Sequence, residues 1–459
     1  MNSTVAQTGK NPSFYRALFV IALPIIFQNF FSSSLNLVDT AMLGQLGETT
    51  VAAVGLANQI FFLLIFVLFG ISSGAAVFTA QLWGKRDIPA IRKVLGLCLG
   101  MGLAGGLLFT IIALFIPEAA ISVYSQDPAV IAAGSGYLRI VGFSYLFTAI
   151  TFSYASVLRS TGNVRLPMFI SIFSIALKTL LNIGLIFGNF GLPQLGILGA
   201  ALATVIARFI ECALLILLAY RMRTPVAARP REMLGFDKKF VRAFLAISLP
   251  VVFNETLWAL GISAYSAVYG HIGTESIAAV NIASSIEGLA FALFIGISDA
   301  CGILVGNKIG EGNEDIAFDY ARRTLRLAIS GAILMGGLIL VGSNTILSIY
   351  KVSAESMLYA RNILTVMAFI FWVRISNMTL IVGVLRSGGD TRFGFIMDAG
   401  TMWVIGVPTA LISAFIFHLE VHWVYLIIMS EEMIKFFIAW WRFRSRRWIH
   451  NVAKSVATV

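Results

Sequence analysis

The residues of this sequence that can do chemistry are a few ionisable side chains inside long apolar stretches. Asp39 ends the stretch ALFVIALPIIFQNFFSSSLNLVD, and Lys178 lies in FSIALKTLLNIGL. Asn182 follows Lys178 by four residues, a spacing that places two side chains on one face of a helix. Thr204 lies in a third apolar stretch, within GAALATVIAR. Because a charge is costly to place away from water, these residues predict a functional polar site.

Cation uptake is the chemistry that Asp39 favours. A carboxylate in an apolar place takes up a proton readily, because burial disfavours its charged form. Protonation would change the hydrogen bonds of Asp39 to Asn182, Thr204 or Lys178, and it would bend the first helix where Pro24 lacks a backbone donor. We therefore predict that Asp39 takes up and releases a cation and thereby biases the conformation. The alternative is a purely structural ion pair between Asp39 and Lys178.

Other ionisable residues in apolar stretches have simpler explanations. Arg208 and Glu211 are three residues apart, and Glu431 and Lys435 are four apart, so each pair is predicted to neutralise itself on one helix. Asp299 is interpreted as an acceptor of a hydrogen bond between packed helices.

The composition excludes a soluble protein. The chain has 459 residues, of which 58% are hydrophobic and 12% charged, and its mean hydropathy is +0.89. Soluble domains carry about 25% charged residues and about 45–50% apolar ones. No compact soluble fold has enough interior to bury this much apolar surface, so we predict an integral membrane protein.

No metal, cofactor or enzymatic site is predicted. The three cysteines form neither a CxxC pair nor a disulfide framework. His418 and His422 flank Glu420, but a zinc site usually needs three or four convergent ligands, and a polar connection is the better interpretation. No nucleophile, base and orienting group converge, and the absence of a GxxxxGK[ST] motif argues against direct use of ATP.

Twelve apolar stretches are long enough to span a membrane as helices. No stretch alternates with a period of two, which argues against a β-barrel. The first stretch is interpreted as an uncleaved span after a polar N-terminus. The predicted cores are 17–38, 52–80, 94–116, 131–157, 165–187, 196–219, 242–268, 276–305, 325–348, 358–384, 393–416 and 423–441.

The connections between these spans alternate in charge. One set is nearly free of Lys and Arg, with only Lys351 and Arg361 as exceptions. The positive-inside rule then places both termini in the cytoplasm, so the net charge of +11 reflects topology and not a nucleic-acid partner. The basic set comprises the N-terminus, Lys85/Arg86/Arg92/Lys93, Arg159/Arg165, Arg221 to Arg242, Lys308 to Arg326, Arg386/Arg392 and the C-terminal RFRSRR.

The two halves of the chain repeat each other. Blocks 226 residues apart agree in three places, and a fourth pair is offset by 227. We predict a first lobe over residues 1–220, a cytoplasmic linker over 221–240 and a second lobe over 241–459. Six spans per lobe make the repeats parallel, an arrangement that suits alternating access to a central cavity. The matching blocks are ALPIIFQN and SLPVVFNE, GQLGETTVAAV and GHIGTESIAAV, FGISSG and IGISDA, and LRSTGN and LRSGGD.

With these features, the chain resembles the multidrug and toxic compound extrusion (MATE) family over nearly its whole length. The stretches that carry the resemblance are ALP…NLVDTAMLGQLG, LRSTGN, LRSGGD and LGILGAALATVIAR. The resemblance implies an all-α membrane protein of twelve helices in two six-helix bundles. It also implies export of organic cations or other amphipathic compounds, driven by inward flow of sodium or protons.

The resemblance implies a cation site in the first lobe. MATE proteins place there an aspartate of the first helix, two polar residues four apart on the fifth and a threonine of the sixth. Asp39, Asn182 and Thr204 match, whereas Lys178 stands where the family usually has asparagine. Since a lysine ammonium would occupy the place and the charge of sodium, we predict proton coupling, with sodium as the second choice. Asp39 and Lys178 would titrate as a coupled pair.

The second lobe departs from the NorM-like branch, which carries an acid on the tenth helix. In this chain the corresponding position falls near Arg374 and holds no acid. The chain is therefore assigned to the DinF-like branch. A cationic substrate would be attracted by acids and aromatic faces. The predicted substrate-binding residues are Gln28, Phe61, Glu255, Trp258 and Glu287.

Two alternatives remain open from the sequence. One is a flippase for lipid-linked precursors within the same superfamily, which the buried residues disfavour because acids outnumber bases once the self-neutralising pairs are set aside. The other is a receptor or sensor that transports nothing. The preferred hypothesis is a monomeric antiporter of the inner membrane, with a small cationic or amphipathic substrate, the lipid bilayer as its surroundings and no cofactor besides the coupling ion.

Overall fold

The computed structural model describes residues 14–348, 350 and 352–456. The predictions made for the polar N-terminus before Phe14 and for Lys351 lie outside these residues. In the described part of the chain every regular element is a helix. Ten helices there are long and apolar enough to cross a membrane, and the number becomes eleven when one bent pair is counted as a single span.

The first half of the chain supplies six spans. The fourth is the bent pair α5 and α6, whose axes differ by 49°. The bend lies at Gly142, where an added Cβ would be 2.6 Å from the Cβ of Ala113, so close packing against α3 requires glycine there. The elements are α1 (Phe14–Gly44), α2 (Glu48–Gly84), α3 (Ile88–Phe115), α4 (Pro117–Ser122), α5 (Pro128–Val141), α6 (Ser144–Ser160), α7 (Arg165–Phe187), η1 (Asn189–Gly191) and α8 (Ile197–Arg221).

The second half follows after the short helix α9 (Pro230–Leu234), which packs against α3. Its last span, α16, carries Glu431, Glu432 and Lys435 and therefore falls outside the purely apolar set, but it completes the predicted twelve. The elements are α10 (Lys238–Ile272), α11 (Thr274–Gly310), α12 (Glu314–Leu347), α13 (Ala354–Met378), η2 (Thr379–Leu385), α14 (Thr391–Thr401), η3 (Met402–Gly406), α15 (Val407–Leu411), η4 (Ile412–Ile416), α16 (Val421–Arg444) and α17 (Val452–Val456).

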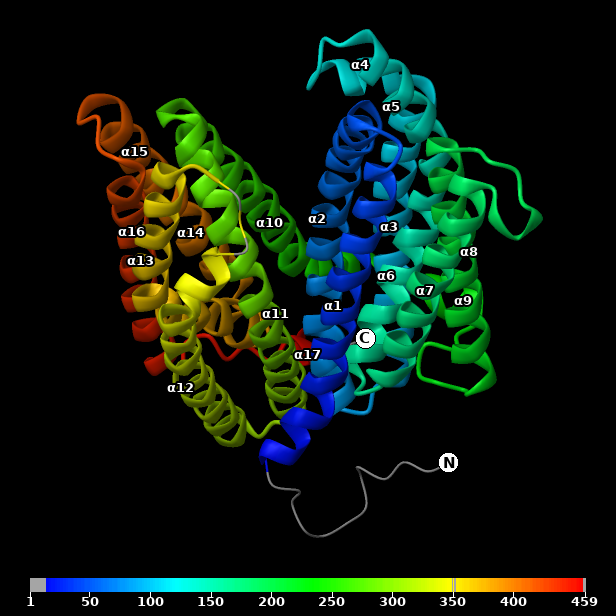
Figure 1. The fold of residues 1–459 in the computed structure, drawn as a ribbon. Coiled ribbons are helices and arrows are strands. Elements are labelled where there is room, and N and C mark those ends of the chain that lie inside the picture. The colour runs from blue at the N-terminus through cyan, green and yellow to red at the C-terminus, as the bar shows by residue number, and fades with distance from the viewer. Residues whose placement is uncertain (1–13, 349, 351, 457–459) are drawn as a thin grey trace.

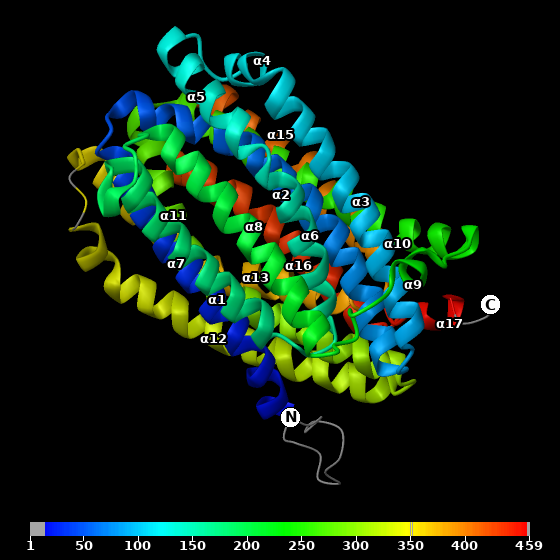
Figure 2. The same ribbon diagram turned by 90° about the vertical axis from the view of Figure 1, so that its right-hand side faces the viewer.

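The two halves form two bundles that stand side by side in Figure 1, and in Figure 2 the first bundle lies in front of the second. The helices α1 and α2 of the first lobe pack against α10 and α11 of the second. The sequence repeat is visible in the backbone, because Pro24 and Pro250 lie inside α1 and α10. Gly162 and Gly389 likewise take the left-handed conformation, with φ of +83° and +82°, after the two LRS motifs. The predicted fold of two similar six-helix bundles is confirmed.

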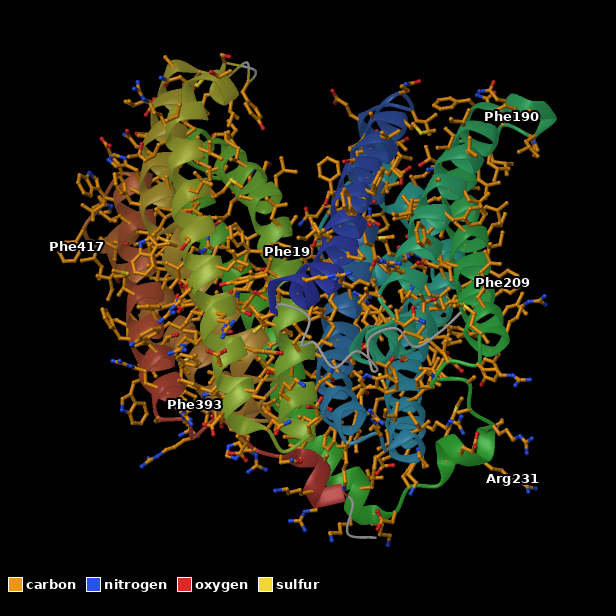
Figure 3. The ribbon with its side chains drawn as sticks, turned by 90° about the horizontal axis from the view of Figure 1, so that it is seen from below. Phe19, Phe190, Phe209, Arg231, Phe393 and Phe417 are labelled. Carbon is orange, nitrogen blue, oxygen red and sulfur yellow. The ribbon has the colours of Figure 1, made fainter. Side chains whose placement is uncertain are left out.

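The outer surface of the bundles is apolar, as a membrane-embedded surface requires. Figure 3 shows Phe209 and Phe417 pointing outward on opposite sides of the molecule. Their exposed fractions are 53% and 65%.

The lobes meet at one end of the molecule, which we call the closed end, and their ribbons diverge toward the other (Figure 1). At the closed end the last turns of α2 and α11 are in backbone contact. A Cβ added to Gly84 would lie 2.0 Å from the carbonyl oxygen of Asn307, and one added to Gly310 would lie 1.8 Å from that of Gln81. Only glycine permits this approach.

The C-terminal segment also joins the lobes at the closed end. The fully buried Gln81 of α2 donates from Nε2 to the carbonyl oxygens of Ser387 (2.9 Å) and His450 (3.1 Å). Its Oε1 accepts the backbone N–H of Val452 at 2.7 Å. Burial opposes ionisation of Asp390 beside this segment, but the nearby His450 and Arg442 outweigh burial and lower the pKa of Asp390 below its ordinary value. The segment thus holds the second lobe against α2.

Substitution of Gly310 by valine is expected to separate the lobes at the closed end, because its side chain cannot fit beside the α2 backbone. Spin labels on cysteines at the exposed positions Lys85 and Glu314 would report a longer distance than in the protein with native Gly310. The three native cysteines are buried, which favours selective labelling of the introduced ones. An unchanged distance would contradict the role given to this contact.

Candidate functional site

The structure brings Asp39, Lys178 and Asn182 together, as their positions in the sequence predict. Asp39 lies on α1 and is 6% exposed. The Nζ atom of Lys178 is 2.6 Å from Oδ2 of Asp39, and Nδ2 of Asn182 donates to Oδ1 at 2.9 Å. Both partners project from one face of α7, so this face supplies both a counter-charge and a hydrogen-bond donor to the carboxylate. A cation or a proton at Asp39 would have to compete with Lys178.

Thr204 lies near this site but does not bind the carboxylate. Its hydroxyl donates to the carbonyl oxygen of Ala200 within α8, at 2.9 Å. Tyr137 of α5 is buried, and its hydroxyl lies within interaction range of Thr204 and Asp39. Sequence reasoning missed Tyr137, because a neutral aromatic residue in an apolar stretch carries no signal beyond core packing. The tyrosine adds a polar hydroxyl to the surroundings of Asp39.

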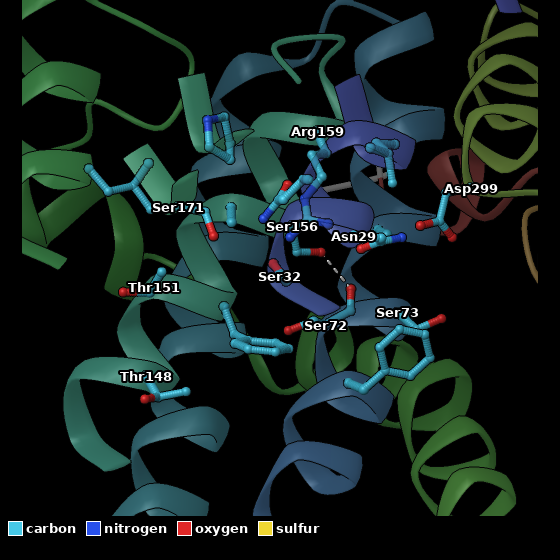
Figure 4. Close-up of a pocket in the computed structure, with 18 of the residues that line it drawn as sticks. Asn29, Ser32, Ser72, Ser73, Thr148, Thr151, Ser156, Arg159, Ser171 and Asp299 are labelled. Atoms are coloured by element: carbon cyan, nitrogen blue, oxygen red, sulfur yellow. Dashed lines mark hydrogen bonds between the residues drawn. The ribbon is translucent and has the colours of Figure 1, made fainter. Parts of the chain in front are cut away.

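A cavity of about 410 Å³ opens beside the Asp39 site and is lined mainly by the first lobe. Lys178 and Thr204 stand on its wall, so the cavity shares two side chains with the predicted cation site. Figure 4 shows that hydroxyl and amide side chains from α1, α2, α6 and α7 surround it. Further wall residues come from α11 and from the segment η2 to Ser387 of the second lobe. The cavity therefore lies where both lobes contribute.

The charges on the cavity wall differ from the expectation that buried acids outnumber buried bases. Arg208 and Glu211 form the predicted ion pair at 2.8 Å, which removes one base and one acid from the comparison. Lys178 is likewise paired with Asp39. The ionisable wall residues are the bases Arg159, Lys178, Arg208 and Arg386 and the acids Glu211 and Asp299. The prediction that buried acids outnumber buried bases is wrong for this cavity, because it treated Arg159 and Arg386 as part of the basic connections.

Of the five predicted substrate-binding residues, Gln28 lies on the wall of the cavity. The two acids are engaged in ion pairs, Glu255 with Arg386 and Glu287 with Arg374. Their roles in substrate binding stay predictions, as does that of Gln28.

The two predicted aromatic faces make ring contacts. Phe61 stacks on Tyr145 inside the first lobe, with ring centres 5.7 Å apart. Trp258 of α10 packs against Phe66 of α2, at 5.9 Å, and so lies between the lobes. Binding of a substrate to either ring stays a prediction.

A second buried cluster of charges lies within the second lobe, around Lys435. Its Nζ is 2.8 Å from Glu431, as the sequence spacing predicts, and 2.9 Å from Asp398. Glu432 is 3.6 Å away, and Nδ2 of Asn254 donates to Asp398 at 2.9 Å. Asp398 was missed, although a carboxylate within the stretch IMDAGTMWV was the available signal. One buried ammonium group thus holds three carboxylates.

Comparison with known proteins agrees with this architecture. The family model MatE matches residues 24–183 and 250–412, which together make up most of the chain. The chain belongs to the MATE family. It is therefore a multi-pass membrane transporter of small molecules, and the six-helix repeat is the MATE repeat. Assignment to the DinF-like branch stays a prediction.

Curated MATE relatives match over nearly their full length. The probable multidrug resistance protein YoeA of Bacillus subtilis is 26% identical over 424 residues, which cover 91% of this chain and 90% of that protein. The multidrug resistance protein NorM of Burkholderia vietnamiensis is 28% identical over 409 residues, 86% of each chain.

Solved MATE structures share the fold. A mutant of the Vibrio cholerae transporter VcmN superposes with a TM-score of 0.87 at 19% identity, covering 96% of this chain and 99% of that one. A transporter of the MOP superfamily from Pyrococcus furiosus, described as having a binding pocket of reverse polarity, superposes with a TM-score of 0.84 at 19% identity, covering 95% and 96%.

Proposed function

We propose that this MATE transporter exports organic cations or amphipathic compounds in exchange for protons across the inner membrane. Its relatives YoeA and NorM are named as multidrug resistance proteins. The observation that carries the proposal is the shared wall of the cation site and the cavity, because Lys178 contacts Asp39 and also lines the cavity. A change of charge at Asp39 therefore reaches the place where a substrate would bind.

The proton acts through the Asp39–Lys178 pair. When Asp39 is protonated, the carboxylate loses its charge and Lys178 loses its counter-ion. The ammonium group of this cavity-lining side chain, which is 26% exposed, then adds an uncompensated positive charge to the wall. A cationic substrate would be repelled in that state, so proton uptake and substrate release are linked.

The lobe arrangement fits an outward-facing state. With both termini in the cytoplasm, as the basic connections predict, the closed end lies on the cytoplasmic side. Protons would then reach Asp39 from outside, and opening of the contact between Gly310 and Gln81 would give the inward-facing state. The linker over residues 221–240 lets the two lobes rock against each other.

Sodium is the weaker alternative as the coupling ion, because the ammonium group of Lys178 already contacts the carboxylate of Asp39. A sodium ion needs several oxygen ligands, and Oδ2 of Asp39 faces the ammonium group at 2.6 Å. Lys178→Asn is therefore expected to make transport respond to a sodium gradient, since an amide oxygen replaces the cation. Lys178→Arg, which keeps the charge, should show no such response. Sodium-driven flux in proteoliposomes is the measurement, and an equal response of both variants would contradict this role of the lysine.

The proposed function is tested with wild-type protein in proteoliposomes loaded with ethidium. A pH gradient, a sodium gradient or neither is imposed, and ethidium flux is recorded by fluorescence. We expect flux under the pH gradient alone. Flux that requires sodium would overturn proton coupling, and absence of flux under every gradient would overturn drug export.

A lipid-linked precursor flippase is the second candidate. The observation in its favour is the set of four basic side chains on the cavity wall, because a lipid pyrophosphate would need positive charge. Transfer of a labelled lipid precursor across the liposome membrane, without ethidium flux, would favour this function. The wall also carries two acids, and two of its bases have carboxylate partners outside the wall, Asp39 and Glu255. We therefore rank the flippase function second.

A further inference from the structure

Two arginines at equivalent positions of the sequence repeat line the cavity, and both lie within electrostatic range of Asp299. Arg159 belongs to LRSTGN and lies in the last turn of α6, and Arg386 belongs to LRSGGD and follows η2. Both line the cavity, one from each lobe. The repeat thus places two guanidinium groups at the junction of the lobes.

Each of these guanidinium groups has a buried nitrogen that lacks a hydrogen-bond partner among the described residues. The atoms are Nε of Arg159 and Nη1 of Arg386. Arg386 is 5% exposed and uses Nη2 to bind Glu255, whereas its buried Nη1 has no acceptor among the described residues. For Arg159, no ion pair occurs within residues 14–348, 350 and 352–456. A buried N–H without an acceptor is unfavourable, so both atoms point to a missing acceptor.

A carboxylate without an ion-pair partner in the described structure lies near the two arginines. Asp299 of α11 lines the cavity and lies within electrostatic range of both Arg159 and Arg386. Figure 4 shows Arg159 and Asp299 on either side of Asn29, well away from Thr148. The sequence had interpreted Asp299 as a helix-packing acceptor, but it accepts no hydrogen bond from the part of the chain that the structure describes. This part of the cavity therefore offers both signs of charge to a ligand.

We propose that Arg159 and Arg386 form a subsite for an oxyanion, a carboxylate or a phosphate, and that Asp299 receives a positively charged group of the same molecule. The preferred substrate is then a zwitterionic amphipath, which would bind more tightly than an organic cation that lacks an acidic group. Guanidinium groups suit this role because their planar N–H donors match the two oxygens of a carboxylate or phosphate. The inference rests on the proposed transport function, whose substrate it specifies.

The position of the subsite also links the ligand to the conformation. Arg159 belongs to the first lobe and Arg386 to the second, so an oxyanion held by both would bridge the lobes. A bridging ligand favours the arrangement in which the two arginines are close and disfavours the one in which they separate.

The test measures binding in detergent, which needs no transport. The probes are rhodamine B, which carries a carboxylate and a cationic ring system, and its methyl ester, which keeps the cation alone. We expect the wild type to bind rhodamine B more tightly than the ester. Arg159→Gln should weaken binding of rhodamine B about tenfold, the size expected for a hydrogen bond to a charged group, and leave the ester unchanged. Asp299→Asn should weaken both.

The controls separate the subsite from other causes. Arg165→Gln removes a nearby exposed arginine that is absent from the cavity wall and should change neither affinity. Competition of rhodamine B by benzoate and by phenyl phosphate identifies the preferred oxyanion. Equal affinity of the wild type for rhodamine B and its ester, or an equal loss of both in Arg159→Gln, would overturn the subsite. Absence of gradient-driven flux with this binding preference intact would instead overturn the proposed function.

Discussion

Replacement of Lys435 by methionine is expected to lower the free energy of unfolding by about 3–5 kcal/mol, the usual cost of removing one partner from a buried ion pair. Lys435 is 3% exposed, and its ammonium group is the shared partner of Asp398, Glu431 and Glu432. Without it, three carboxylates remain inside the second lobe with mutual repulsion. The melting temperature in detergent should fall steeply.

Lys308→Met is the matched control for this substitution. Lys308 also forms an ion pair on a helix, with Glu311 at 2.7 Å, but this pair is solvent-accessible. Surface pairs contribute about 0–1 kcal/mol, so the control should change the melting temperature little. Similar small changes in both variants would show that the Lys435 cluster does not hold the lobe together.

Asp39→Asn is expected to reduce pH-driven ethidium flux to the rate measured without a gradient. Asparagine keeps an acceptor for Asn182, but it cannot take up a proton or balance the charge of Lys178. The variant should still fold, because Lys178 lines the cavity and its side chain is 26% exposed, so its charge can be hydrated. Flux and melting temperature are measured on the same preparation.

Asp87→Asn provides the control for the Asp39 variant. Asp87 caps α3 by accepting the backbone N–H of Ala90 at 3.1 Å, and asparagine caps helices about as well as aspartate. Its flux should equal that of the wild type. Undiminished pH-driven flux in Asp39→Asn would remove the carboxylate from the coupling mechanism.

The contacts of Asp39 in the first lobe could be predicted because helix spacing alone decides part of their geometry. Lys178 and Asn182 are four residues apart, so both face the same way on α7, and a lone carboxylate in an apolar stretch needs partners. The self-neutralising pairs followed from the same rule. Thr204 was expected as a direct partner, but a threonine inside a helix satisfies its hydroxyl locally, on the carbonyl of Ala200.

Sequence reasoning could not place Arg159 and Arg386 on the cavity wall. One reason is that helices extend beyond the apolar cores from which the spans were predicted. The predicted fourth span ended at residue 157, whereas α6 continues to Ser160 and turns Arg159 into the cavity. Arg386 does lie in a connection, directly after η2, but its side chain still lines the cavity. Charge counts along the sequence also say nothing about which carboxylates meet a base, so the pairing of Glu255 with Arg386 emerged only from the fold.

Substrate-induced proton release tests the central claim most directly. Ethidium is added to the purified transporter in weakly buffered detergent solution, and a pH indicator records released protons for the wild type and for Asp39→Asn. We predict proton release that scales with bound ethidium in the wild type, is unaffected by sodium and is absent in Asp39→Asn. Equal proton release from both proteins, or binding of ethidium to the wild type without any release, would contradict proton exchange at Asp39.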